Sequence, residues 1–376
     1  MSGELFIGLM SGTSMDGIDG VLIDLAPSAD FRILRHCHQA FDDTLRSALF
    51  ALNEAGDNEL HRAALAANAL ALAYADVVSA LLQQSGLRHT DVRAIGAHGQ
   101  TVRHRPNTFD GLGYTCQLLN GAILAERSGI DVVCDFRSRD VAAGGQGAPL
   151  VPAFHRAAFS TRHGDTAVIN IGGIANITFL PAAGPVGGLD CGPGNVLLDA
   201  WCKQHTGHSY DHDGAWARSG TLHTGLLASL MQDSYIQQRP PKSTGRDHYN
   251  QAWLSGQLHR HGSPQTTIAP QDIQNTLVHL TVQAAVQEID RNMPSADRLL
   301  VCGGGAFNRY MMDCMRVALP NMLVAPVNDV CNLDPMHVEA AAFAWLAQAH
   351  RDRRHANCPA VTGATGARIL GACYPA

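Results

Sequence analysis

Asp190 is a candidate general base in this 376-residue sequence. It lies in the segment GLDCGPGN, after a short apolar stretch and before a helix that we expect to begin near Asn195. A carboxylate at the end of a strand can take the proton of an attacking oxygen during phosphoryl transfer, with Mg²⁺ offsetting the charge that develops. The alternative is that Asp190 only caps the following helix.

Three glycine-rich turns follow apolar segments and are candidate anion sites. The first, SGTSMDGID, contains Gly12 and Gly17, but it lacks the lysine of a Walker A loop and the spacing of a dinucleotide-binding fingerprint. The others contain Gly172 with Gly173, and residues 303–305 at the start of an expected helix. A single turn of this kind is often only a bend or a point of close packing. Three of them in one chain favour a nucleotide site.

Polar side chains lie next to other predicted strand ends. His98 and Gln100 are in HGQTVR, and Arg137 is in DFRSRD. This mixture of donors and acceptors suits a polyhydroxylated anionic ligand, because an arginine can bind a carboxylate through two parallel hydrogen bonds. Alternatively, Arg137 pairs with Asp140. The basic segment RPPKSTGRD, which contains Lys242, predicts a loop that either closes over the site or lies in solvent.

Short apolar segments alternate with helical ones, which predicts an α/β protein. Strand pairs are expected at 5–9 with 20–25 and at 166–170 with 176–180, each around a glycine-rich turn. This recurrence suggests an internal duplication that gives two similar lobes facing a cleft. A last helix is expected at 337–350. Further strands are expected at 31–38, 92–97, 113–118, 132–135 and 299–302, and further helices at 44–54, 60–85, 122–128, 194–205, 222–233, 273–292 and 306–318.

The composition argues against several classes of partner. The net charge is -6 and the basic residues are scattered, so we expect no nucleic-acid partner. No basic segment precedes an apolar run at the start, and no window approaches the roughly 20 apolar residues that span a bilayer, so we expect a cytoplasmic protein with no membrane partner. The 10 cysteines include no C-x-x-C pair and the 19 histidines no H-E-x-x-H, which argues against a dedicated transition-metal site.

The motifs, taken together and in order, resemble those of anhydro-N-acetylmuramic acid kinases nearly from end to end. They are GLMSGTSMDGID, GAHGQTVRH, DFRSRDVAAGGQGAPLVP, NIGGIANIT, GLDCGPGN, RPPKSTGRD, VCGGGAFN and EAAAFAWLA. The resemblance implies the two-lobed, ribonuclease H-like fold of the actin and sugar-kinase superfamily, with ATP between the lobes. It places one lobe at 1–136 and the other at 137–376, with the last helix packing back on the first lobe.

The resemblance also implies a reaction and its residues. Water opens the 1,6-anhydro bridge while ATP phosphorylates O6, which gives N-acetylmuramic acid 6-phosphate and ADP during peptidoglycan recycling and amino-sugar catabolism. Asp190 would activate the water. The residues implied to contact ATP are Gly12, Thr13, Ser14, Met15, Asp16, Gly17, Ile18, Asp19, Gly172, Gly173, Gly303, Gly304, Gly305 and Asn308. Those implied to bind the sugar are His98, Gln100, Arg137 and Glu339.

Some expectations stay open at this point. The cofactors are ATP and Mg²⁺, but the protein ligands of the metal are unknown, and a homodimer is one alternative for the oligomeric state. The chain departs from the family's usual motifs at Cys191 and Phe307. A kinase for another hexosamine is the runner-up. A non-catalytic, actin-like nucleotide switch is a further alternative, against which the presence of Asp190 argues.

Overall fold

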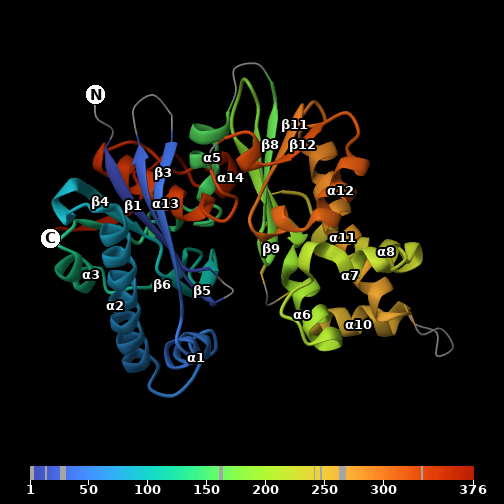
Figure 1. Cartoon of the computed structure of the whole chain (residues 1–376), viewed down its shortest axis with the longest axis horizontal. Coiled ribbons are helices and arrows are strands. Elements are labelled where there is room, and N and C mark those ends of the chain that lie inside the picture. Colours follow the sequence, from blue (N-terminus) through green and yellow to red (C-terminus); the bar gives the residue numbers. More distant parts are fainter. Residues whose placement is uncertain are drawn as a thin grey trace. The chain divides into compact units, whose positions relative to one another are not determined.

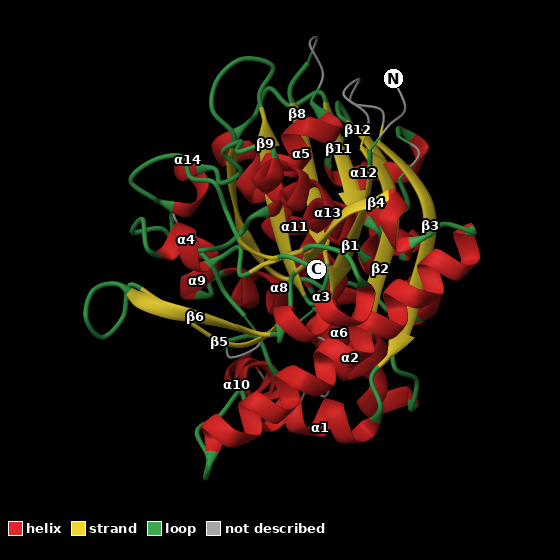
Figure 2. Cartoon of the chain, turned by 90° about the vertical axis from the view of Figure 1, so that its left-hand side faces the viewer, coloured by secondary structure: helices red, strands yellow, loops and turns green. Residues whose placement is uncertain are grey.

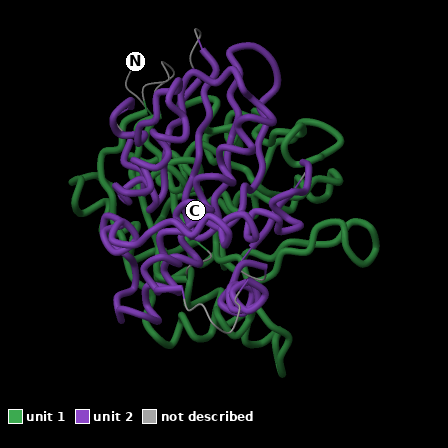
Figure 3. The backbone as a smooth tube through the Cα atoms, turned by 90° about the vertical axis from the view of Figure 1, so that its right-hand side faces the viewer, with its two compact units in different colours: residues 1–158, 337–376 green, residues 159–336 purple. Residues whose placement is uncertain are grey.

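The chain folds into two units, each built around its own β-sheet (Figures 1 and 3). Unit 1 comprises residues 1–158 and 337–376, and unit 2 comprises residues 159–336. The computed structural model describes residues 4–12, 15–25, 31–160, 164–240, 242–245, 248–261, 268–331 and 333–376.

The sheet of unit 1 has the order β13-β7-β4-β1-β2-β3. Its first three strands along the chain are antiparallel neighbours, and the next two lie parallel to the first. The strands are β1 (Leu5–Met10), β2 (Gly17–Leu25), β3 (Phe31–Ala40), β4 (Val92–Ala97), β7 (Val132–Cys134) and β13 (Ala372–Tyr374).

The sheet of unit 2 repeats this arrangement with the order β10-β9-β8-β11-β12. Again the first three strands are antiparallel neighbours and the last two lie parallel to the first. The strands are β8 (Thr166–Ile171), β9 (Ile174–Leu180), β10 (Gly187–Pro193), β11 (Arg298–Cys302) and β12 (Leu323–Pro326). The shared order 3-2-1-4-5 confirms the predicted duplication and the α/β fold of two ribonuclease H-like units.

Helices α2 (Glu59–Ser85) and α13 (Val338–Arg351) cover opposite faces of the sheet of unit 1. Ile7 and Leu9 of β1 share a buried cluster with the apolar residues of α2. A side chain at Gly8, between them, would collide with the backbone of α13. Successive residues of a strand point to opposite faces, so each helix covers its own face.

Helix α2 is long and apolar enough to cross a membrane by length and composition, which differs from the sequence-based expectation. In the structure, Leu70, Tyr74 and Val78 of this helix are buried in the core of unit 1. The helix also contacts β2, β3 and α3 (Gly121–Ser128). The apolar composition of α2 is therefore that of a core helix.

The other elements complete the two units. Unit 1 also contains a separate two-stranded sheet (Figure 2), made of β5 (Gln100–Pro106) and β6 (Gly113–Leu118), and helices α1 (Asp43–Ala51), α4 (Ser138–Val141), α5 (Val151–Phe159) and α14 (Pro359–Thr362). Unit 2 contains α6 (Asn195–Thr206), α7 (Ala215–Ser219), α8 (Thr224–Met231), α9 (Ser234–Gln237), α10 (Gln251–His261), α11 (Pro270–Asn292) and α12 (Arg309–Ala318). Helix α11 contacts β10, α6, α7, α8 and α12, so it is the central helix of this unit.

The units divide the chain at a different place from the one that the resemblance implied. Residues 137–158 belong to unit 1, whereas we expected them in the second lobe. The reason is packing within unit 1. Asp140 of α4 is fully buried and accepts a hydrogen bond from Asn357 at 2.7 Å. Phe154 of α5 lies against Trp345 of α13, with 6.3 Å between the ring centroids.

Candidate active site

Asp190 lies within β10 rather than at a strand end, next to a β-bulge. The register of β10 on β9 shifts between Asp190 and Gly192, so that Cys191 is the extra residue. A bulge of this kind turns the local side chains relative to a regular strand. Helix α6 has Gly194 as its N-cap and no side-chain cap hydrogen bond. The alternative that Asp190 caps this helix is therefore wrong.

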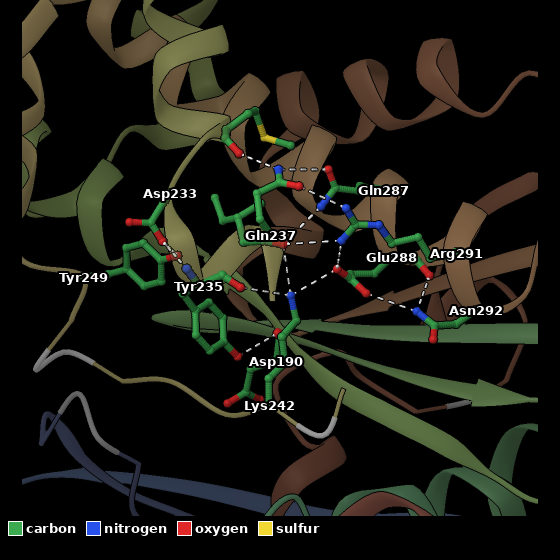
Figure 4. A network of polar contacts seen from close by, with 12 residues as sticks. Asp190, Asp233, Tyr235, Gln237, Lys242, Tyr249, Gln287, Glu288, Arg291 and Asn292 are labelled. Atoms are coloured by element: carbon green, nitrogen blue, oxygen red, sulfur yellow. Dashed lines mark hydrogen bonds and ion pairs between the residues drawn. The ribbon is translucent and has the colours of Figure 1, made fainter. Parts of the chain in front are cut away.

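Three of the hydrogen bonds among the described residues hold Asp190 in place, and Figure 4 shows the surrounding network. The backbone N–H of Thr244 donates to Oδ2 of Asp190 at 3.0 Å, and the hydroxyl of Tyr235 donates to its carbonyl oxygen at 2.9 Å. Its own N–H donates to the carbonyl oxygen of Lys242 at 3.5 Å. A backbone N–H that donates to a carboxylate favours the ionised form, which is the form a general base needs.

The second glycine-rich turn joins β8 to β9 and supports the start of α6. The carbonyl oxygen of Gly172 accepts from the N–H of Asn195 at 2.8 Å. The carbonyl oxygen of Gly173 accepts from the N–H groups of Gly194 and Val196 at 2.9 and 3.1 Å. The first N–H groups of α6 are thus bound within the protein, and the turn has a structural role at this position.

The third glycine-rich turn combines two packed glycines with an exposed one. Gly303 has a φ of 74° and donates to the carbonyl oxygen of Pro335 at 3.0 Å, and a side chain at Gly305 would collide with Ile171. Gly304 is exposed, and a Cβ there would meet only the Asn195 side chain, at 3.5 Å. Packing therefore explains Gly303 and Gly305 but leaves Gly304 without a structural reason.

Residues Asn308 and Phe307 follow the third turn. Asn308 is the N-cap of α12, and its side chain accepts from the N–H of Met311 at 3.0 Å. Phe307, where the family pattern has a histidine, is half exposed at 50%. The cap hydrogen bond gives Asn308 a structural role besides the contact with ATP that the resemblance implies.

We expect alanine at Gly304 and at Gly305 to have opposite effects. Gly304→Ala has space and should leave the free energy of unfolding within about 0.5 kcal/mol of wild type while raising KM for ATP. Gly305→Ala overpacks against Ile171 and should lower that free energy by about 1–3 kcal/mol. Urea unfolding and ATP kinetics on both variants provide the measurement. An unchanged KM in Gly304→Ala would remove the case for nucleotide contact at this glycine.

The first glycine-rich turn joins β1 to β2, and Thr13 and Ser14 lie outside the described residues. The carbonyl oxygen of Gly12 accepts from the N–H of Met15 at 3.2 Å and from Nε2 of Gln100 at 3.0 Å. Gly12 and Met15 are therefore bound to each other through their main chains, and Gly12 is also bound by the side chain of Gln100 from β5.

The side chains after this turn point in different directions. Met15 and Ile18 are buried, so their side chains contribute to the core, and these residues can offer a ligand only their main-chain groups. Gly17 is buried too, and a Cβ there would collide with the backbone of β3. Asp16 is exposed. Asp16 is thus the described residue of this turn whose side chain can reach an incoming ligand directly.

Asp19 of β2 is bound by two histidines of β3. Nδ1 of His38 lies 2.9 Å and Nε2 of His36 lies 3.3 Å from Oδ1 of Asp19. Burial raises the pKa of Asp19, but the hydrogen bonds with His36 and His38 outweigh burial and leave the pKa below its ordinary value. Asp19 is therefore ionised at neutral pH, and its Oδ1 is already engaged.

His98 binds Arg137 and stays neutral. Nε and a terminal nitrogen of Arg137 donate to Nε2 of His98 at 3.1 and 3.0 Å, and a further nitrogen donates to the carbonyl oxygen of Gly147 at 2.8 Å. Nδ1 of His98 lies 3.3 Å from the carbonyl oxygen of Ser11, so this nitrogen carries the proton. Burial, and then the charge of Arg137, lower the pKa of His98 to about 3. His98 therefore orients the guanidinium group.

Gln100 and Glu339 are the other two residues of unit 1 that the resemblance implies to bind the sugar. Gln100 is fully buried, and its Oε1 has no hydrogen-bond partner among the described residues. Glu339 lies in the first turn of α13, and burial raises its pKa, although the charge of Arg137 opposes the shift. The structure thus brings Glu339 within electrostatic reach of Arg137 and Asp19, which helical periodicity alone did not indicate.

Comparison with known proteins gives matches over the whole chain. The model of a family described as anhydro-N-acetylmuramic acid kinase matches residues 4–376. The chain is 53% identical over 381 residues to the anhydro-N-acetylmuramic acid kinase of Variovorax paradoxus (strain S110), with 100% of both chains covered. It is 49% identical over 371 residues to the protein of that name from Nitrosomonas europaea, with 99% of each covered.

Comparison with solved structures gives alignments of low sequence identity and low TM-score. A ROK family glucokinase from Streptomyces griseus in complex with glucose and AMPPNP aligns with a TM-score of 0.43 at 16% identity, covering 92% of this chain and 99% of that one. The activator of the 2-hydroxyisocaproyl-CoA dehydratase from Clostridium difficile with bound ADPNP aligns with a TM-score of 0.45 at 12% identity, covering 93% and 97%.

Proposed function

Because the chain belongs to the anhydro-N-acetylmuramic acid kinase family, we propose that it phosphorylates O6 of 1,6-anhydro-N-acetylmuramic acid with ATP while water opens the anhydro bridge. The observation that carries this proposal is the half-buried Asp190, whose carboxylate is oriented by the N–H of Thr244 at 3.0 Å. The products are N-acetylmuramic acid 6-phosphate and ADP, which places the enzyme in peptidoglycan recycling and amino-sugar catabolism.

Asp190 acts as the general base in this proposal. It takes a proton from water as the water oxygen bonds to the anomeric carbon. The bond between that carbon and O6 breaks, and O6 bonds to the γ-phosphorus as ADP leaves. An ether oxygen is a poor nucleophile, so bridge opening and phosphoryl transfer have to be coupled. The carboxylate then loses its proton to solvent.

The proposed ATP contacts come from glycine-rich turns in each unit. Main-chain N–H groups in glycine-rich turns can approach phosphate oxygens closely. Asp16 in the first turn and Gly304 in the third turn support this role, because both residues are exposed. The full set proposed is Gly12, Thr13, Ser14, Met15, Asp16, Gly17, Ile18, Asp19, Gly172, Gly173, Gly303, Gly304, Gly305 and Asn308.

Mg²⁺ enters as its complex with ATP. This ion is normally held by phosphate oxygens, water and one or two carboxylates rather than by a protein cage. No group of three His, Cys, Asp or Glu side chains in the described part of the chain could hold a metal ion. We propose that the enzyme is cytoplasmic, since the ten cysteines, which all lie in the described part of the chain, form no disulfide, and ATP is a cytoplasmic substrate. The homodimer stays a prediction.

The proposed sugar contacts are His98, Gln100, Arg137 and Glu339 of unit 1. Arg137 suits the lactyl carboxylate, which a guanidinium group can bind with two hydrogen bonds. Oε1 of Gln100, which has no partner among the described residues, can accept from a sugar hydroxyl or an amide N–H. His98 contributes by holding Arg137. The carboxyl group of Glu339 can accept from a hydroxyl and lies within electrostatic reach of Arg137.

We expect Arg137→Met to lose discrimination for the lactyl group. The variant should raise KM for the anhydro sugar by about 10- to 100-fold, because a hydrogen bond to a charged group contributes about 1.5–3 kcal/mol. Its activity on 1,6-anhydro-N-acetylglucosamine, which lacks the lactyl carboxylate, should change little. Steady-state kinetics on the two sugars provide the measurement. Equal losses on both sugars would show that Arg137 does not bind the carboxylate.

A substrate panel tests the proposed function. ADP release from ATP and Mg²⁺ is measured with 1,6-anhydro-N-acetylmuramic acid, N-acetylmuramic acid and N-acetylglucosamine. We expect turnover with the anhydro sugar. Turnover with the open hexosamines alone would support the runner-up, a hexosamine kinase. ATP binding without turnover of any sugar would support the nucleotide switch.

A further inference from the structure

The segment 242–245 lies directly against β10 at Asp190. The N–H of Asp190 donates to the carbonyl oxygen of Lys242 at 3.5 Å. Two residues later, the N–H of Thr244 donates to the carboxylate of Asp190 at 3.0 Å. The orientation of the carboxylate therefore depends on the placement of this short segment. A loop segment needs an anchor in the core to hold a carboxylate with catalytic precision.

The side chain of Lys242 provides that anchor and does not reach solvent. Its side chain is 0% exposed, and Nζ donates to the carbonyl oxygens of Tyr235 and Ile236 at 3.3 and 3.2 Å and to Oε1 of Glu288 at 3.0 Å (Figure 4). An ammonium group has three protons to donate, so these three bonds use them all. The alternative that this basic segment lies in solvent is therefore wrong for Lys242, whose side chain is buried in unit 2.

Glu288 fixes the other end of this anchor in α11. Its side chain is 1% exposed, and its Oε1 also accepts from Arg291 at 3.2 Å. Its Oε2 accepts from the amide of Asn292 at 3.1 Å. The carboxylate is bound on both oxygens, so Lys242 is attached to the central helix of unit 2 through a fully paired buried charge.

Tyr235 connects the same anchor to Asp190 from a second side. Its carbonyl oxygen accepts from Lys242, and its hydroxyl donates to the carbonyl oxygen of Asp190 at 2.9 Å. Burial, and then the Asp190 carboxylate, raise the pKa of Tyr235, so its phenol stays protonated and remains a donor. Asp190 is consequently held at its N–H, its carbonyl oxygen and its carboxylate by residues that the buried ammonium fixes.

We infer that Lys242 and Tyr235 are positioning residues for Asp190, through the main chain and through the N–H of Thr244. This inference rests on the proposed role of Asp190 as the base. Neither residue touches substrate or ATP in this account. Their effect is on the chemical step, because a carboxylate displaced by about 1 Å can cost roughly 100-fold in rate.

Two variants and a control test this inference. Lys242→Met with Glu288→Gln removes both charges, so no unpaired charge stays buried, and Tyr235→Phe removes one hydroxyl group. We expect kcat to fall about 100-fold in the first and about 10-fold in the second, with KM for ATP within about twofold of wild type. The control Tyr249→Phe also loses one buried hydrogen bond, to Asp233 at 3.0 Å, but has no contact with Asp190 among those described. Its kcat should not change.

Two further readouts separate positioning from a purely structural role. In the paired variant the loss should fall on kcat, with KM for the anhydro sugar within about twofold of wild type, because the carboxylate is displaced while the proposed sugar contacts of unit 1 are unchanged. Hydrogen exchange at the N–H of Thr244 should become faster in both variants but not in Tyr249→Phe. Hydrogen exchange can be measured on an inactive protein, so this readout does not depend on turnover. If the paired variant folds poorly, Tyr235→Phe alone still tests the inference.

The failures are distinguishable. If the wild-type protein does not turn over the anhydro sugar, the proposed function fails, and exchange at Thr244 still reports on the anchor. If the wild type is active but both variants match Tyr249→Phe in kcat and in the exchange rate at the N–H of Thr244, then Lys242 and Tyr235 are structural residues only. In that case the inference is overturned.

Discussion

Asp190→Asn lowers kcat on 1,6-anhydro-N-acetylmuramic acid by about 100- to 10,000-fold, the contribution usual for a general base. Asparagine has almost the volume of aspartate, and its carbonyl oxygen can still accept from the N–H of Thr244, which is bound at 3.0 Å in the wild type. An amide cannot take a proton from water, so the loss falls on the chemical step. Steady-state kinetics and an independent measurement of ATP affinity should show unchanged nucleotide binding.

Asp211→Asn is the matched control for this prediction. Asp211 also lies in unit 2 and is half-buried, and its carboxylate accepts from the N–H groups of Trp216 and Ala217 at 2.9 Å each. The same change from carboxylate to amide should weaken these bonds and lower stability, while kcat stays within a fewfold of wild type. If the two variants lose activity equally, or if Asp190→Asn keeps more than a tenth of the wild-type kcat, Asp190 is not the base.

Lys242→Met alone should be among the most destabilising single changes in unit 2. It leaves the carboxylate of Glu288, which is 1% exposed in the wild type, without its closest ammonium partner. Breaking a buried pair by removing one member costs about 3–5 kcal/mol of the free energy of unfolding. Urea unfolding followed by circular dichroism measures this loss.

The double variant Lys242→Met with Glu288→Gln should recover most of that stability, because neither charge is then left unpaired. Stability and catalysis should therefore separate: the double variant regains the fold but not kcat. Equal instability of the single and double variants would show that the hydrogen bonds of Lys242 to the carbonyl groups of Tyr235 and Ile236, rather than its charge pairing, account for the loss.

The sequence allowed much of the fold to be predicted because the strands are short, apolar and close to glycine-rich turns. Strands at 5–9, 20–25, 166–170 and 299–302 lie within or overlap β1, β2, β8 and β11. By contrast, the sequence indicated only a strand end at Asp190 and gave no bounds for β10. Its sequence, GGLDCGP, is rich in glycine and lacks the alternation of a half-buried strand, and its pairing with β9 across a bulge creates it.

The sequence indicated candidate chemical residues for the site but not the residues that support them. Asp190 and the glycine-rich turns stand out because few residue types can perform their roles. Tyr235 and Glu288 do not stand out, since a tyrosine and a glutamate in helical segments have ordinary structural explanations. Their relation to Asp190 comes from contacts between distant parts of the chain, and no local pattern reports those contacts. Glu339 is a similar case: helical periodicity did not single it out, and only the resemblance to the family did.

The product formed from 1,6-anhydro-N-acetylmuramic acid, ATP and Mg²⁺ in ¹⁸O-labelled water tests the central claim most directly. We expect a product heavier than the sugar by one phosphoryl group and one water, with the label at the anomeric carbon and none in the phosphate. That result requires water to open the bridge while O6 takes the phosphoryl group. A product that carries a phosphoryl group without added water, or ADP release with the label in inorganic phosphate, would contradict it.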